Sequence, residues 1–290
     1  MRLTIFTPTF NRAYILKKLY KSLLNQTNLN FVWLIIDDGS TDDTKNLIDM
    51  FHNEDKIHIK YIYQKNQGKM QAHNTAVLSC QTEFFFCVDS DDYLVNDSVE
   101  KMYKAIDFIE NEPKLSGTIF YRGKNNYEII GNEFPEGIKN ISLSDLYRSG
   151  FSGDTSLLYK TDVLRNYLFP YIEGEKFIPE DYIYKQIDQV YEMQLVPSIL
   201  IVTKYLDDGY SNNIGKVIIK NPKSWSLYNL LLSKYEKNLI KKTKYIRIYI
   251  TFALLGKNKK ILKLSNNKIL TTLLYPLGYI GYLHKKRLRG

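Results

Sequence analysis

Three acidic side chains lie within four positions of this chain, at Asp89, Asp91 and Asp92. They follow a run of five apolar residues at 84–88, which is typical of a strand buried on both faces. In an extended chain, residues i and i+2 point to the same side, about 6–7 Å apart, so Asp89 and Asp91 can face one ligand. Two carboxylates this close repel each other unless a positive charge lies between them. The pair therefore favours a divalent cation that also carries a phosphate group.

A strand that ends in a solvated acidic turn would give the same local pattern, so the surrounding elements decide between the two interpretations. Residues 3–6, 31–36 and 57–63 are short apolar runs that predict further strands. Between the strands, apolar residues recur at a spacing of three or four, which predicts helices. Four strands alternating with three helices predict an α/β fold with a Rossmann-like, mainly parallel sheet flanked by helices and joined by right-handed crossovers.

Polar residues follow all four predicted strands. They occupy positions 7–12, 37–38, 66–69 and 89–92. Each cluster alone would be an ordinary loop, but the carboxyl ends of parallel strands share one edge of the sheet, where ligands bind. Their convergence at this edge is what an active site requires.

The pattern of elements is looser after Asp92. The expected elements are a helix that ends before Pro113, strands at 118–121 and 127–130, a helix near 142–149, and strands at 156–159 and 199–205. Pro179 suits a helix start, and Glu180 and Asp181 then fall in the first turn, where the helix dipole favours acidic residues. Dipole compensation alone would explain these two acids. The apolar side of this helix would carry Ile183, Ile187, Val190 and Tyr191.

Charge divides the chain into two regions. Residues 216–290 contain 18 Lys and Arg but one acidic residue, Glu236, whereas residues 1–215 carry a net negative charge. We therefore expect an enzyme domain at 1–215 and a basic helical region at 216–290. The two cysteines, Cys80 and Cys87, lack metal-ligand spacing and indicate reduced thiols in a cytosolic protein. No signal peptide is expected, because a strand pattern begins directly after Arg2.

The ordered series of polar motifs resembles family 2 glycosyltransferases of the GT-A fold. The motifs are Thr7-Pro8-Thr9-Phe10-Asn11-Arg12, Asp37-Asp38-Gly39-Ser40-Thr41-Asp42, Asn66-x-Gly68-Lys69, Asp89-Ser90-Asp91-Asp92 and Glu180-Asp181. No single motif would be specific, but five in this order are. The resemblance extends over roughly the first 210 residues and implies inverting, metal-dependent transfer of a hexosyl or N-acetylhexosaminyl group from a nucleotide-sugar.

The resemblance also implies a role for each motif. Residues 8–10 would cradle uracil and ribose, Asp38 would accept a hydrogen bond from the pyrimidine ring nitrogen, and Lys69 would approach the diphosphate. The full set of implied nucleotide-sugar ligands is Pro8, Thr9, Phe10, Asn11, Arg12, Asp38, Asn66, Lys69, Asp89 and Ser90. Mn²⁺ or Mg²⁺ would be coordinated by Asp91, with Asp89 and Asp92 beside it.

The same resemblance makes Asp181 the general base, with Glu180 beside it. Many relatives place a histidine late in the catalytic domain, whereas this chain has Asp207-Asp208-Gly209-Tyr210-Ser211 there. No histidine of the chain is assigned to a metal, because the four show no ligand spacing.

The chemistry agrees with these roles. Displacing a nucleoside diphosphate from an anomeric carbon builds negative charge on the leaving phosphate, which a metal at Asp91 can stabilise. Deprotonating an acceptor hydroxyl needs a positioned carboxylate, and one direct displacement inverts the anomeric carbon.

The basic region mixes Leu, Ile and Tyr with Lys at helical spacing. Its longest uncharged run, 269–283, is shorter than the ~20 residues that span a bilayer and contains Pro276, so no transmembrane helix is expected. Basic amphipathic helices suit an anionic membrane surface. A helical bundle packed on the enzyme with a solvated lysine face is about equally compatible. Nucleic-acid binding is not expected, because no nucleic-acid module accompanies the charge.

Together these features predict transfer from a UDP-sugar to a hydroxyl of a cell-surface glycan, such as a capsule, exopolysaccharide or wall polymer. The acceptor can be a lipid-linked saccharide, and the enzyme would then be peripheral at the cytoplasmic face of the membrane. The alternatives are a nucleotidyltransferase or sugar-nucleotide hydrolase on a similar fold, and a non-catalytic subunit that binds membranes or polyanions.

Overall fold

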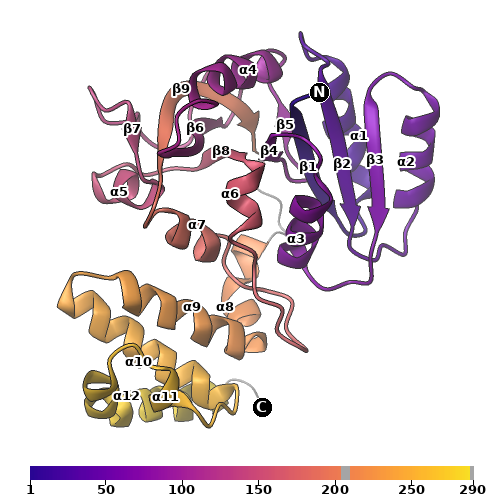
Figure 1. The fold of residues 1–290 in the computed structure, drawn as a ribbon. Helices are drawn as coiled ribbons and strands as arrows, with labels where there is room; N and C mark the ends of the chain where they lie inside the picture. The colour runs from indigo at the N-terminus through magenta and orange to yellow at the C-terminus, as the bar shows by residue number, and fades with distance from the viewer. Residues whose placement is uncertain (204–209, 288–290) are drawn as a thin grey trace. The chain divides into compact units, whose positions relative to one another are not determined.

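The computed structural model describes residues 1–203 and 210–287 (Figure 1). The chain forms two compact units, which are described separately below. The first unit contains residues 1–168 and continues from Ile183 through the last strand, and the second contains Phe169–Tyr182 and the C-terminal helices. A short segment before residue 183 therefore belongs with helices that follow it much later in the sequence.

The first unit is built on a nine-stranded sheet in the order β3-β2-β1-β4-β8-β6-β9-β5, with β7 paired to β9. The strands are β1 Leu3–Thr9, β2 Phe31–Asp37, β3 His58–Tyr63, β4 Phe84–Cys87, β5 Tyr93–Leu94, β6 Leu115–Gly123, β7 Asn140–Ile141, β8 Thr155–Lys160 and β9 Glu192–Val202. Strands β3, β2, β1 and β4 are parallel, as are β6 and β9, while β8 runs antiparallel to both its neighbours. The predicted α/β fold with a mostly parallel sheet is confirmed.

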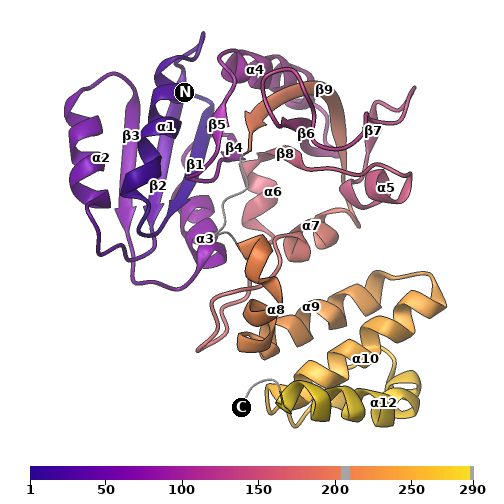
Figure 2. The ribbon, with the colours of Figure 1, turned by 180° about the vertical axis from the view of Figure 1, so that it is seen from behind.

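The helices that accompany the sheet are α1 Ala13–Leu24, α2 Thr44–Asn53, α3 Lys69–Ser79, α4 Ser98–Ile109, α5 Leu143–Arg148 and α6 Thr161–Arg165. Helix α7 Asp181–Ile187 begins in the second unit and continues into the first. Figures 1 and 2 show α1 and α2 on one face of β1, β2 and β3, and α3 on the other. On the first face Tyr20 stacks on Trp33 and Phe51, which shows how the apolar side of each predicted helix is buried.

Three predicted elements differ from the structure. Residues 127–130 form no regular strand, because the Asn125 side chain accepts the backbone N–H groups of Tyr127 and Glu128 and closes a turn. The helix expected to carry Val190 and Tyr191 ends at Ile187, and Val190 is exposed. The strand expected at 199–205 instead begins at Glu192, since it pairs along β6. Residues 204–205 of that strand and residues 207–209 of the acidic cluster lie outside the described residues.

The second unit contains α8 Tyr210–Lys220, α9 Pro222–Tyr235, α10 Leu239–Leu255, α11 Ile261–Leu264 and α12 Lys268–Arg287. Its core gathers around α10, where Tyr249 and Ile250 pack with Leu270 and Leu274 of α12. Gly278 lets α12 approach α10 closely, because a Cβ there would lie 2.5 Å from the Ile250 side chain. Among the described helices, none is both long and apolar enough to cross a membrane.

Candidate active site

Asn11 joins the loops that follow β1 and β2. Its backbone N–H donates to Ser40 Oγ at 2.8 Å, and its Oδ1 accepts the backbone N–H groups of Thr41 at 2.8 Å and Asp42 at 3.3 Å. Asn11 adopts a left-handed backbone with φ 54°, which asparagine tolerates better than most residues. This part of the first motif therefore fixes the position of the second.

The buried carboxylate of Asp38 accepts three hydrogen bonds from the segment before α3. The donors are Gln64 Nε2 at 2.7 Å, Gln67 N–H at 2.9 Å and Gly68 N–H at 2.7 Å. A carboxylate offers about four lone-pair sites, so one remains for a further donor. Asp38 thus holds the third motif in place, a structural role that the sequence did not reveal. The hydrogen bond to a pyrimidine ring that the resemblance predicts would use the remaining lone-pair site.

Lys69 is the first residue of α3, and its Nζ lies 2.7 Å from Asp89 Oδ1 after β4. Gly68 precedes it with φ 94°, a conformation that costs glycine little. Burial opposes ionisation of Asp89, but the charges of Lys69 and Arg122 prevail and lower the pKa of Asp89. The third and fourth motifs therefore meet through an ion pair.

Asp92 is bound by a residue that the sequence analysis missed. Its Oδ2 lies 2.8 Å from Arg122 Nη1, and Arg122 Nε also donates to Thr155 O at 3.1 Å. Burial raises the pKa of Asp92 to about 7, with the charges of Asp89 and Asp91 adding to the shift and Arg122 opposing it. Arg122 lies near the end of β6, whose other residues are all uncharged. A charged residue in such a strand is the signal that could have identified it, because buried charges are normally paired.

The acidic motif fits a metal that also binds the diphosphate of a ligand. Within residues 1–203 and 214–287, no group of three His, Cys, Asp or Glu side chains forms a complete metal site. Mg²⁺ and similar ions usually take one or two carboxylates and receive their other oxygens from phosphate and water. Asp91 is half-buried, and both burial and the Asp89 charge raise its pKa, so a cation there would relieve the repulsion. The buried Oδ1 of Asp92 has no hydrogen-bond partner among the described residues.

The other residues that are predicted to bind the nucleotide-sugar differ in exposure. Thr9 and Ser90 are buried, Phe10 is exposed, and Pro8 and Asn66 are half-buried. Thr9 Oγ1, at the carboxyl end of β1, lacks a hydrogen-bond partner within the described part of the chain. The charge of Arg12 acts on both Asp89 and Asp91. All four N-terminal motifs are thus linked at the edge that the strand pattern predicted.

Glu180 and Asp181 belong to the second unit. Glu180 is exposed, whereas Asp181 is half-buried and its Oδ2 accepts the Tyr228 hydroxyl at 2.8 Å. Burial, together with the Asp181 charge, raises the pKa of Tyr228, so the phenol stays protonated and donates. Tyr228 lies on α9 and was not predicted, because the sequence gives no sign of which C-terminal residue meets Asp181.

Two further contacts dock the segment before Asp181 onto α9. The Glu175 carboxylate accepts the backbone N–H groups of Lys223 at 2.8 Å and Ser224 at 2.7 Å, at the start of the helix. Asn221 Oδ1 accepts the Lys176 N–H at 2.9 Å. Residues of the basic region therefore position the segment that carries the predicted base.

Replacing Arg122 with methionine should destabilise the first unit by about 3 kcal/mol, because it leaves the buried Asp92 carboxyl without its charged partner and the Thr155 carbonyl without its Nε donor. The free energy of unfolding in urea measures the effect. Arg148→Met is the matched control, since it removes an exposed ion pair with Asp145 and should cost less than about 1 kcal/mol. An equal decrease in the free energy of unfolding in the two variants would show that the Arg122–Asp92 pair stabilises the protein no more than an exposed ion pair does.

His73 predicts a pH-dependent stability. It lies on α3 against the rings of Phe6 and Phe85, and burial, with the Lys69 charge, lowers the pKa of His73 to about 3. The pKa of a histidine in an unfolded chain is about 6.5, so between pH 3 and pH 6.5 the unfolded state binds a proton that the folded state does not. The free energy of unfolding therefore decreases as the pH falls below 6.5.

The loss between pH 7.5 and pH 5.0 should include about 2 kcal/mol from His73. His73→Met should therefore lose about 2 kcal/mol less than the parent protein over this range, measured by urea unfolding at both pH values. His58→Met, at an exposed histidine, should behave like the parent. A pH dependence that is unchanged in His73→Met would contradict the assignment.

Comparison with known proteins agrees with this geometry. The family model for glycosyl transferase family 2 matches residues 4–168. Glycosyltransferase GlyA of Streptococcus pneumoniae is 30% identical over 155 residues, which cover 51% of this chain and 22% of that protein. The GalNAc(5)-diNAcBac-PP-undecaprenol beta-1,3-glucosyltransferase of Campylobacter jejuni is 28% identical over 174 residues, covering 58% of this chain and 54% of that enzyme. The chain thus spans less than a quarter of the length of GlyA.

Among solved structures, the crystal structure of S. aureus TarS 1-349 in complex with UDP-GlcNAc has a TM-score of 0.63 at 15% identity, over 99% of this chain and 91% of that one. This likeness confirms the GT-A type of fold. The family model covers more than half of the sequence, and it includes the first four motifs on which the resemblance was based. The chain belongs to glycosyl transferase family 2.

Proposed function

We propose that this protein is an inverting, metal-dependent glycosyltransferase that moves a hexosyl or N-acetylhexosaminyl group from a UDP-sugar to a hydroxyl of a cell-surface glycan. The observation that carries the proposal is the linked edge of four loops, which ends in the Lys69–Asp89 pair and Asp91. Because the chain belongs to family 2, we infer that this edge would supply a nucleoside side, a diphosphate side and acidic residues for a cation. Residues 1–215 would act as the catalytic domain, a boundary that stays a prediction.

The nucleoside of the donor would bind beside β1 and β2. Thr9 Oγ1 offers an unused hydroxyl, the exposed ring of Phe10 offers a flat apolar surface, and Asp38 retains capacity for one ring N–H. Neighbouring Asn11 and Asn66 shape the loops around this site. The TarS structure bound to UDP-GlcNAc supports uracil as the base and an N-acetylhexosamine as one candidate sugar.

The diphosphate would bind between the basic and acidic side chains after β4. Lys69 and Arg12 bring positive charge to the leaving group, and Asp91, with Asp89 and Asp92, would hold the cation. A bound Mn²⁺ or Mg²⁺ would neutralise the charge that develops on the leaving phosphate. Arg122 keeps Asp92 in place, and Ser90 is buried between the acidic residues.

The acceptor hydroxyl would lose its proton to Asp181, with Glu180 as its neighbour at the start of α7. The hydrogen bond from Tyr228 to Oδ2 orients the Asp181 carboxylate. The other carboxylate oxygen, Oδ1, would then accept the proton. The oxygen of the acceptor then forms a bond to the anomeric carbon as the bond to the diphosphate breaks. A single displacement of this kind inverts the configuration.

The acceptor is proposed to be a growing glycan, in lipid-linked form at the cytoplasmic face of the membrane. The Campylobacter jejuni relative, whose name specifies an undecaprenol-linked acceptor, supports this choice. The positive charge of residues 216–290 supports association with an anionic membrane surface, and no nucleic-acid partner is proposed.

The configuration of the product tests the mechanism. UDP-sugars of the gluco series are α-linked, so we expect a β-linked product, read from the anomeric proton coupling in the NMR spectrum of the purified glycan. An α-linked product would contradict the single displacement at Asp181. Formation of free sugar as the main product, with acceptor present, would favour a hydrolase instead.

A further inference from the structure

Helix α12 carries an exposed apolar stripe formed by Ile269, Leu273, Leu277 and Ile280. Their exposed fractions are 77%, 69%, 50% and 63%, although large aliphatic side chains are usually buried. The spacing of four, four and three residues places them on one side of the helix. We call these four residues the outer stripe.

A different side of α12 is already used for packing. Leu270 and Leu274 pack against the α10 core, Gly278 is buried, and its carbonyl accepts the Thr251 hydroxyl at 3.0 Å. The position of α12 in its own unit is thus fixed by these contacts. The outer stripe is left as a second apolar face that the unit itself does not cover.

Positive charge borders the outer stripe at both ends. Lys268 opens α12, and Lys285, Lys286 and Arg287 close it. The sequence from residue 237 onward contains no Asp or Glu. A surface with aliphatic residues in the middle and cations at its ends has the chemistry of a helix that lies in the plane of an anionic lipid interface.

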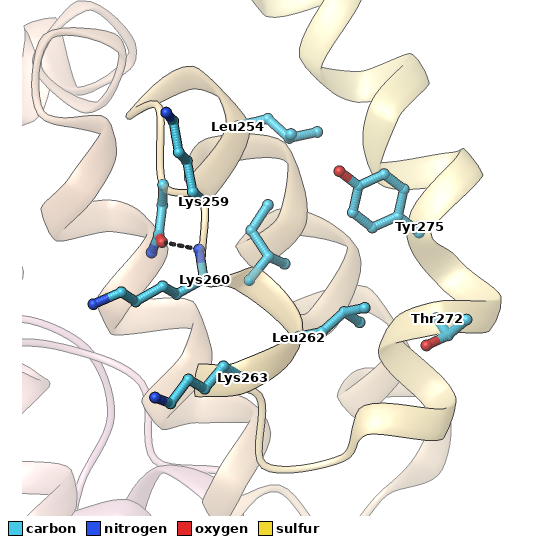
Figure 3. Close-up of a pocket in the computed structure, with 9 residues that line it drawn as sticks. Leu254, Lys259, Lys260, Leu262, Lys263, Thr272 and Tyr275 are labelled. Carbon is cyan, nitrogen blue, oxygen red and sulfur yellow. Dashed lines mark hydrogen bonds between the residues drawn. The ribbon is translucent and has the colours of Figure 1, made fainter.

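A cavity of about 690 Å³ between α11 and α12 also combines apolar side chains with lysines (Figure 3). Leu254, Leu262 and Tyr275 line it, while the side chains of Lys259, Lys260 and Lys263 extend away from α12 (Figure 3). Apolar lining therefore adjoins a lysine cluster here as well.

We propose that the outer stripe of α12 docks on the surface of an anionic lipid bilayer, with the helix lying parallel to the membrane. Lipid is favoured over a second copy of this chain for an electrostatic reason. A symmetric dimer places the same patch on both partners, so the cations at the ends of one stripe would face cations of the other. Phosphate headgroups of anionic lipids would instead pair with these cations.

Membrane docking rests on the proposed function in one respect, because it assumes an acceptor linked to lipid. The two are nevertheless separable. Liposome binding can be measured without any donor, and release of UDP can be measured without liposomes. A protein that binds liposomes but releases no UDP would contradict only the catalytic proposal, and the opposite result would contradict only docking.

Co-sedimentation of the full chain with liposomes tests the proposal. Binding is expected to vesicles of phosphatidylcholine with phosphatidylglycerol at low salt, to weaken at high salt, and to be weak with phosphatidylcholine alone. Leu273→Gln/Leu277→Gln should lower the partition coefficient at least about tenfold, since it removes apolar contacts with the bilayer. Leu239→Gln/Ile240→Gln is the matched control at two exposed residues of α10 and should keep most of the binding.

Equal losses in the two double variants would overturn the assignment to α12. A lack of binding to anionic vesicles at low salt would overturn docking altogether. Light scattering tests whether a second copy of the chain covers the stripe instead. If the parent protein is a dimer that does not bind liposomes, and Leu273→Gln/Leu277→Gln makes it a monomer, the stripe joins two copies.

Discussion

Replacing Asp91 with asparagine is expected to lower metal-dependent release of UDP by about 10²–10³-fold while the protein stays folded. Asparagine keeps the size of the side chain but removes the charge that would hold the cation near the diphosphate. Folding should not suffer, because burial and the Asp89 charge already raise the pKa of Asp91 and make its charged form unfavourable in the isolated protein. Steady-state kinetics over a range of Mn²⁺ concentrations measures the change.

Two controls make the Asp91 result specific. Asp43→Asn replaces an exposed carboxylate near the start of α2 and should leave turnover and metal dependence unchanged. Circular dichroism and urea unfolding of Asp91→Asn should match the parent. Full activity in Asp91→Asn would remove Asp91 from the metal site and leave Asp89 and Asp92 as the candidates.

Replacing Asp181 with asparagine is expected to lower the rate of transfer by about 10²–10⁴-fold, which is the usual contribution of a general base. Donor binding should persist, because no part of the proposed nucleotide site depends on Asp181. The dissociation constant for the UDP-sugar, measured by calorimetry, should therefore stay within about twofold of the parent. A variant that kept full transfer would show that another group takes the proton.

Tyr228→Phe provides a graded version of the same test. It removes one hydroxyl that donates to Asp181 at 2.8 Å and should lower kcat about tenfold with KM for the donor unchanged, because the loss of one such bond is worth about 1–2 kcal/mol. Tyr235→Phe, on the same helix, is the matched control and should have no effect. Equal kinetics for both phenylalanine variants would mean that Tyr228 does not position the base.

The sequence was most informative where one local pattern determines an element. The apolar runs at Phe31 and Phe84 predicted β2 and β4, and the polar residues after them lie at the shared strand edge, as parallel pairing requires. These features depend on residues close together in the chain. They were therefore readable without knowledge of the tertiary structure.

The partners of the site residues could not be read in the same way. Arg122 follows Asp92 by 30 residues and Tyr228 follows Asp181 by 47, so only the fold identifies either pair. Asp38 illustrates the same limit, because a carboxylate expected to face a ligand also accepts three donors from the protein.

The basic region had two interpretations from sequence, a packed bundle and a membrane-binding helix. In the structure, one face of α12 packs within the second unit and another is exposed, and we propose the exposed face for membrane docking. Leu270 and Leu274 pack with α10, whereas Leu273 and Leu277 are exposed. Periodicity alone could not separate them, since both faces are apolar in the sequence.

Release of nucleoside diphosphate from a panel of nucleotide-sugars, with Mn²⁺ or with EDTA, tests the central claim most directly. The panel should contain UDP-, GDP-, CDP- and dTDP-linked sugars, with Asp91→Asn as the inactive control. We predict that at least one UDP-sugar is consumed, that EDTA abolishes its turnover, and that Asp91→Asn reduces it to near background. Turnover of a non-uridine donor alone, or turnover of a UDP-sugar that EDTA leaves unchanged, would contradict the proposed donor or the proposed metal.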